Sequence, residues 1–171
     1  MDRHMVWGMI KDWGTALLLA LAVLGIWRAL APAPVSSGEA PELILDDLQG
    51  ETFVLAEDAS AVTVVNFWAT WCAPCRSEIP EFSEFAAEHP DVRVLGVSVD
   101  DALDTPRLAR AAKRLGVSYT VLHDRKLEVA RRWGVQGYPT TFILDAEDHV
   151  VAVRTGALDA AALESLVESA R

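Results

Sequence analysis

Both cysteines of the chain lie close together, where a strand-like sequence gives way to a helix-like one. The run 62–68 is almost entirely β-branched and aromatic, which predicts a strand buried on both faces. A helical pattern begins at Ala73, so Cys72 stands at a predicted helix start. Free backbone N–H groups and the positive end of the helix dipole both stabilise a thiolate there. The sequence therefore predicts a reactive dithiol, Cys72 and Cys75, at a strand-to-helix junction.

Three other uses of a cysteine pair fit this sequence poorly. A structural zinc site needs four ligands, and none of the histidines (His4, His89, His123 and His149) has metal-type spacing to the pair. A static disulfide across two residues closes almost no loop and stabilises little. A peroxidase with one peroxidatic cysteine would carry Thr or Ser three residues earlier, where this chain has Ala69. The favoured interpretation is a dithiol that carries out thiol–disulfide exchange.

Position along the helix divides the roles of the two cysteines. We expect Cys72, at the very start, to be the more exposed thiol and the nucleophile. Cys75 lies one turn further in, and we expect it to be more buried and to act as the resolving thiol. Pro74 suits the first turn, where its missing N–H leaves no helical bond unmade.

Composition limits the remaining functions. The chain has 171 residues and a formal charge of −10, which corresponds to one domain of ordinary size plus an appendage. Its acidity argues against a nucleic acid partner, which would require basic patches. The sequence has no Gly-rich phosphate loop, no metal-spaced His/Asp cluster and no internal repeat. We therefore expect no cofactor and no resident metal.

The appendage is an uncharged N-terminal run from Trp13 to Trp27. Extended to Ala31, a helix would span roughly 28 Å, close to the hydrocarbon core of about 30 Å. Arg3 and Lys11 precede the run, so the positive-inside rule favours a cytoplasmic N-terminus. We expect a transmembrane anchor, with the rest of the chain on the far side of the membrane.

Two alternatives to an anchor are weaker. A cleavable signal peptide has a similar layout, but Pro32 would directly follow the cleavage site at Ala31, and Arg28 intrudes on it. A buried helix of the folded domain would not be apolar on all sides. The expected organisation is a cytoplasmic N-terminus over 1–12, a transmembrane signal-anchor over 13–31, a Pro-rich linker over 32–41 and one folded domain over 42–171.

The folded domain alternates strand and helix patterns, and its first two strands flank a turn as in a hairpin. This order predicts a βαβ crossover followed by ββα, an α/β sandwich with helices on both faces. We expect strands at 43–45, 52–55, 62–68, 92–99, 141–144 and 150–153, and helices at 73–88, 105–115, 126–133 and 158–170.

Pro139 stands immediately before one of the predicted strands. Proline is tolerated at a strand start, so a simple turn is one interpretation. The more specific interpretation is a cis proline in a tight turn, and the aromatic Tyr138 before Pro139 favours the cis form.

Taken together, these motifs resemble a thioredoxin fold, and more narrowly the TlpA/ResA/CcmG (DsbE) group of membrane-anchored thiol–disulfide oxidoreductases. The resemblance lies in residues 65–80 around the dithiol, 134–145 around Pro139 and the hairpin opening 41–55. It covers most of the chain after the linker. It implies a central mixed sheet flanked by helices, an N-terminal β-hairpin extension and one preceding transmembrane helix.

The resemblance also implies roles for residues around the dithiol. Pro139 would be cis and beside the dithiol, with the Tyr138 backbone available to pair with a substrate strand. Glu78 would assist proton transfer, although a glutamate near a helix start is also favoured by the helix dipole alone. Asn66 replaces the buried aspartate of thioredoxin and cannot accept a proton, which strengthens a role for Glu78. The expected substrate-binding residues are Trp71, Ala73, Pro74 and Tyr138.

As a function, the resemblance implies an oxidoreductase of the bacterial inner membrane whose catalytic domain faces the periplasm or outside. Its clients would be disulfides of apocytochrome c or of copper-site proteins, and a membrane thiol reductase of the CcdA or DsbD type would restore the dithiol. Two alternatives stay open on the same cysteines. One is a copper-handling assembly factor, since thiolates are soft ligands. The other is an oxidase that introduces disulfides.

Overall fold

The structure is a computed structural model, which divides the chain into one unit over Met1–Ala33 and a second over Pro34–Arg171. In the first unit, 16–17 and 19–23 are helical and exposed. No helix among the described residues is long and apolar enough to cross a membrane. The structure describes residues 16–17, 19–23, 37–57 and 62–171. The expected segment 1–12 lies outside these residues, and so does most of the expected segment 13–31.

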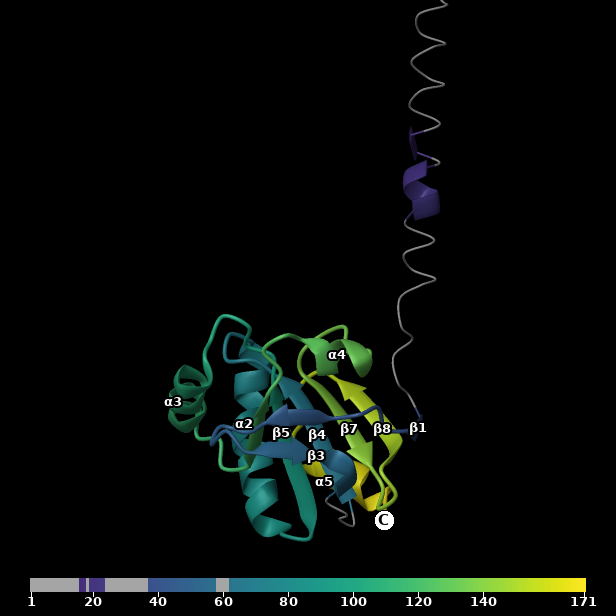
Figure 1. The fold of residues 1–171 in the computed structure, drawn as a ribbon. Coiled ribbons are helices and arrows are strands. Elements are labelled where there is room, and N and C mark those ends of the chain that lie inside the picture. The colour runs from purple at the N-terminus through teal and green to yellow at the C-terminus, as the bar shows by residue number, and fades with distance from the viewer. Residues whose placement is uncertain (1–15, 18, 24–36, 58–61) are drawn as a thin grey trace, which may run out of the picture. The chain divides into compact units, whose positions relative to one another are not determined.

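The second unit is built on a six-stranded mixed sheet in the order β1-β8-β7-β4-β5-β6 (Figure 1). β4 pairs in parallel with β5 and antiparallel with β7, so it lies inside the sheet. Every residue of β4 is buried, as its continuous apolar run predicts. The strands of this sheet are β1 (Gly38–Glu39), β4 (Val62–Trp68), β5 (Val92–Ser98), β6 (Thr120–His123), β7 (Thr140–Leu144) and β8 (His149–Thr155).

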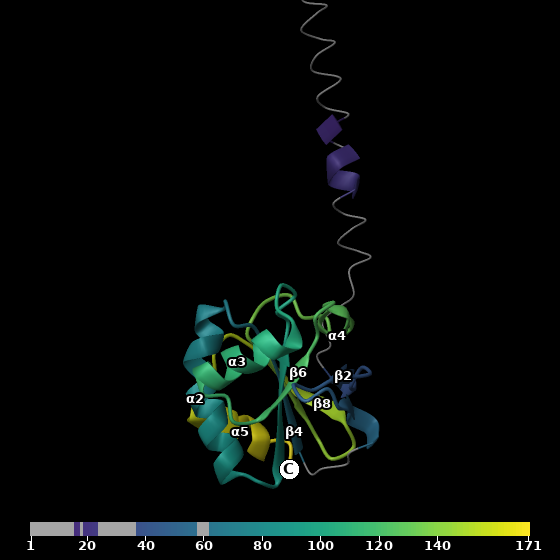
Figure 2. The same cartoon turned by 60° about the vertical axis from the view of Figure 1, so that its left-hand side comes forward.

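Both faces of the sheet are covered. Helices cover one face, and a short helix with a separate hairpin covers the other (Figure 2). The three-helix face carries α2 (Ala73–Glu88), α3 (Thr105–Leu115) and α5 (Ala160–Glu168). The opposite face carries α4 (Glu128–Arg132) and the antiparallel hairpin of β2 (Ile44–Asp46) and β3 (Thr52–Val54), whose second strand leads into the 3-10 turn η1 (Leu55–Glu57).

Two apolar clusters pack against the sheet, and one of them reaches both faces. Phe82 and Phe85 of α2 pack with Leu163 of α5 over the sheet on one side. On the other, Trp133 meets Phe67 and Phe142, with ring centroids 5.6 and 4.9 Å away. β4 contributes to both clusters because its successive side chains alternate between the two faces. The end of β4 is therefore fixed from both sides.

Most of the expected elements are confirmed, and the differences have local causes. α2 has the predicted bounds and continues through Pro80. α5 starts later than 158 because Asp159 caps it, with its side chain accepting a bond from Ala162 N. The edge strand β6 was not expected, since 120–123 is too short to give a pattern. β1 falls within the range 32–41 expected to be linker, where it pairs with β8.

Candidate active site

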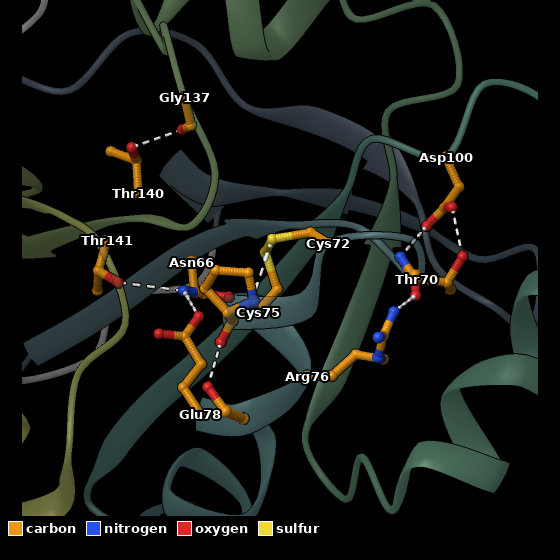
Figure 3. Close-up of a disulfide and its surroundings, with 12 residues drawn as sticks. Asn66, Thr70, Cys72, Cys75, Arg76, Glu78, Asp100, Gly137, Thr140 and Thr141 are labelled. Atoms are coloured by element: carbon orange, nitrogen blue, oxygen red, sulfur yellow. Dashed lines mark hydrogen bonds between the residues drawn. A yellow bond between two sulfur atoms is a disulfide. The ribbon is translucent and has the colours of Figure 1, made fainter.

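The two cysteines form a disulfide at the start of α2 (Figure 3), with a sulfur–sulfur distance of 2.08 Å and Cα atoms 5.2 Å apart. Cys72 is the N-cap residue of the helix and has extended backbone angles. Its side chain is 6% exposed, whereas Cys75 is fully buried. The predicted order of exposure is confirmed, and a client can reach Cys72 more easily than Cys75.

The first turn of α2 is arranged around the Cys72 sulfur. The backbone N–H of Cys75 donates to Cys72 Sγ across 3.2 Å. When the disulfide opens, the same N–H can donate to a Cys72 thiolate, which favours the charged form. The intervening Ala73 and Pro74 are exposed and uncharged. They leave an open, neutral surface beside the sulfur.

Asp100, a residue that sequence reasoning missed, anchors the loop before Cys72. Its carboxylate accepts bonds from Thr70 N (2.9 Å), Thr70 Oγ1 (2.6 Å) and Ser98 Oγ (2.8 Å). On the other side of this loop, the Arg76 guanidinium donates to Thr70 O across 3.0 Å. The sequence contained a signal. Ser98 pairs with Trp68 in the parallel ladder, so residues just past both strands meet at one edge of the sheet.

Glu78 lies on the opposite side of the disulfide from Asp100 (Figure 3) and is only 2% exposed. Asn66 Nδ2 donates to one of its oxygens across 2.9 Å, and Leu158 N donates to the other across 3.1 Å. Burial raises the pKa of Glu78 from its ordinary value of 4.5 to about 7, although these two hydrogen bonds oppose the rise. The carboxyl can therefore gain or lose a proton near neutral pH.

The second predicted motif lies at the same end of β4. The Tyr138–Pro139 peptide bond is cis, as expected. Thr140 pairs with Phe67 in the antiparallel ladder. Pro139, one residue earlier, therefore lies level with the C-terminal end of β4, from which the chain continues to the dithiol. The Tyr138 ring meets Trp71 edge-to-face at 5.9 Å, and Trp71 is 61% exposed. Burial raises the pKa of the Tyr138 hydroxyl.

The fold thus gathers every predicted site residue around the junction of β4 and α2. Their catalytic and substrate-binding roles stay predictions, since the structure holds no bound client. In the part of the chain that the structure describes, no three His, Cys, Asp or Glu side chains cluster as metal ligands would. The residues brought together are Trp71, Cys72, Ala73, Pro74, Cys75, Glu78, Tyr138 and Pro139.

Comparison with known proteins agrees with this geometry. The model of the AhpC/TSA family matches residues 37–153. A DsbE thiol:disulfide interchange protein of Allochromatium vinosum is 37% identical over 163 residues, 85% of this chain and 88% of that protein. The ResA thiol-disulfide oxidoreductase of Geobacillus thermodenitrificans is 31% identical over 162 residues, 90% of this chain and 91% of the relative. The chain belongs to the AhpC/TSA family and is related to DsbE- and ResA-type thiol–disulfide oxidoreductases.

A solved structure supports the thioredoxin-like fold of this oxidoreductase. It is a thiol:disulfide interchange protein of the thioredoxin family from Chlorobium tepidum. The TM-score is 0.67 at 28% identity, over 81% of this chain and 97% of that structure. The enzyme is therefore a DsbE/ResA-like thiol–disulfide oxidoreductase with a thioredoxin-like domain.

The Glu78 carboxyl predicts a pH dependence of stability in the disulfide form of the oxidoreductase. The folded-state pKa is the higher one, so the folded protein binds this proton more tightly than the unfolded chain does. The stabilisation is complete below pH 4.5 and is lost as the pH rises through about 7. Since one pKa unit corresponds to about 1.4 kcal/mol, we expect the free energy of unfolding to fall by roughly 3 kcal/mol across this window.

Urea unfolding at a series of pH values measures this loss. Glu78→Gln cannot titrate, and the variant should lose that part of the pH dependence. Glu84→Gln, at an exposed position of the same helix, is the matched control and should keep it. Parallel pH profiles for wild type and Glu78→Gln would show that Glu78 has no raised pKa.

Proposed function

We propose that this oxidoreductase reduces disulfides of client proteins outside the cytoplasm. The Cys72 thiolate attacks a client disulfide, and the leaving client sulfur takes up a proton. Cys75 then attacks the mixed disulfide, which releases the second client thiol and closes the Cys72–Cys75 bond. Two electrons pass from the enzyme dithiol to the client disulfide, and no other redox partner takes part in this half of the cycle.

The surroundings of the sulfurs are the observation that supports the reducing direction. A strong oxidant of this kind needs its reduced form stabilised. Among the described residues, Cys72 Sγ accepts one backbone hydrogen bond and no bond from a cationic side chain. Arg76, in the first turns of the same helix, donates to the backbone carbonyl of Thr70. An ionised Glu78, three residues after Cys75 and buried, would oppose a thiolate there. Beyond the stabilisation that the helix start itself provides, the thiolate form therefore receives no support from a charged side chain among the described residues.

The proposed clients are disulfides that must be opened in an oxidising compartment. The resemblance to DsbE- and ResA-type proteins favours haem-binding cysteines of apocytochrome c or cysteines of copper sites. Each turnover leaves the enzyme oxidised, so a reductant must restore the dithiol. We propose a membrane thiol reductase of the CcdA or DsbD type for this step.

The reduction potential of the Cys72–Cys75 couple tests the direction. We expect a value near that of thioredoxin, about −270 mV, because no cationic side chain adds to the stabilisation of the thiolate by the helix start. Equilibration of the full chain against dithiothreitol and glutathione buffers measures it, with the thiol fraction read after alkylation. A value near that of DsbA, about −120 mV, would instead make the protein an oxidase.

Trapping tests the roles of the two cysteines. Cys75→Ser should accumulate mixed disulfides with client proteins, because the first attack proceeds and the second does not. Cys72→Ser should form no adducts and lose roughly 100-fold or more of the exchange rate, since the nucleophile is gone. Non-reducing electrophoresis with and without dithiothreitol detects the adducts. Full activity in Cys72→Ser would reverse the assignment.

We also propose that 13–31 is an uncleaved anchor in the inner membrane of a bacterium, with the catalytic domain on its outer side. The uncharged run from Trp13 to Trp27 and the cations before it support this topology. An anchor would hold the catalytic domain at the membrane surface, next to the membrane thiol reductase that we propose as its electron donor.

Membrane fractionation and intact-mass measurement test the anchor. The protein should stay in carbonate-washed membranes with its N-terminal residues present. Leu21→Arg puts a charge inside the run, at a cost of about 2.5–3.5 kcal/mol in a membrane helix, and should release more protein. A mature mass that lacks residues 1–31 would mean a cleaved signal peptide.

A further inference from the structure

A groove of about 470 Å³ opens beside the loop that carries the dithiol. Thr70 and three arginines of α3 line it. Leu103 and Leu115 add apolar surface. We call this feature, with its cations Arg107, Arg110 and Arg114, the basic groove.

The charge of the basic groove departs from that of the whole chain. The protein has 25 acidic and 15 basic residues, yet α3 carries four basic residues and no acidic one. Spacings of three and four residues bring the three arginines to one side of the helix. Asp104 lies 3.7 Å from Arg107. Arg110 and Arg114 are exposed, and neither forms an ion pair or hydrogen bond with the residues that the structure describes.

The basic groove is connected to the dithiol through Thr70. Thr70 stands two residues before Cys72 and is held by Asp100 from the interior. Arg76 adds a further cation to this loop from α2, with its guanidinium 3.0 Å from Thr70 O. Figure 3 shows Arg76 and Thr70 on the side of the disulfide away from Glu78. Positive charge therefore flanks the approach to Cys72 on this side.

We propose that the basic groove binds acidic residues that flank the client disulfide. A client joined to Cys72 has its neighbouring residues within reach of Thr70, because an extended chain advances about 3.3 Å per residue. Arginine pairs with carboxylates through two parallel hydrogen bonds, and the apolar surface of Leu103 and Leu115 accepts an aliphatic side chain. Opposite charge also speeds the encounter of the two proteins. The inference rests on the proposed exchange reaction and names the class of client it prefers.

The test compares three synthetic peptides with the same disulfide loop, flanked by Glu, Ser or Lys. The reduced full chain in a non-ionic detergent is mixed with each peptide at low salt, and the second-order rate constant is measured. Each constant is divided by that of free dithiothreitol with the same peptide, because flanking charges also alter the reactivity of the disulfide itself. We expect the corrected rate to be roughly tenfold higher for the Glu peptide than for the Lys peptide.

Charge reversal locates the effect. The double variant Arg110→Glu/Arg114→Glu should lower the rate of the Glu peptide roughly tenfold and leave the Ser peptide unchanged, and added salt should weaken the wild-type preference. The rate of Arg110→Gln/Arg114→Gln with the Glu peptide should lie between those of the wild type and the charge-reversed double variant. Arg110→Glu and Lys113→Glu form the matched pair, since both reverse one charge on α3, but Lys113 lines a different groove, near Gln49 and Gly116.

The outcomes separate this inference from the proposed function. Equal corrected rates for all three peptides, or equal losses in Arg110→Glu and Lys113→Glu, would overturn the docking of acidic clients while leaving the exchange reaction intact. A fully reduced enzyme that reacts with none of the peptides would overturn the exchange reaction itself. A loss confined to Arg110→Glu and to the Glu peptide would support the basic groove.

Discussion

The junction between β4 and α2 is the constraint on which the rest of this structure depends. β4 is buried along its whole length, and α2 starts only a few residues after it ends. Cys72 is therefore held at a helix start, where backbone N–H groups lack helical partners. Apolar clusters on both faces hold the strand. The position of the sulfur is thus largely a consequence of core packing.

Two buried carboxyl groups flank that junction, and their different partners separate their effects. Asp100 takes bonds from two hydroxyls and a backbone N–H around the loop before Cys72. Glu78 takes one amide bond and one backbone bond, which is too little to offset burial, so the pKa of its carboxyl rises to about 7. The first group can fix the geometry of the loop. The second can hold or release a proton beside the dithiol at physiological pH.

Local patterns predicted much of this arrangement. The apolar run of β4, the cysteine spacing and the helix pattern after Ala73 are contiguous in sequence, and each has its own physical signature. The cis bond before Pro139 could be expected from its aromatic neighbour. Asp100 and β6 could not be found in this way, because their roles arise from contacts with segments distant in the chain. The contact of Glu78 with Asn66, twelve residues earlier, likewise depends on how α2 packs against β4.

Reactivity and client preference can vary independently in this architecture. Ala73 and Pro74 carry no charge. The groups that can affect the reduction potential of the dithiol therefore lie beneath the sulfurs, in the backbone of α2 and at Glu78. The charges that an approaching client meets lie to the side, on α3 and at Arg76. Thr70 links the two regions through backbone and hydroxyl contacts and brings no charge of its own. Substitutions on α3 can therefore change which disulfides dock without changing the energy of the dithiol, because surface charges are screened by solvent over the intervening distance.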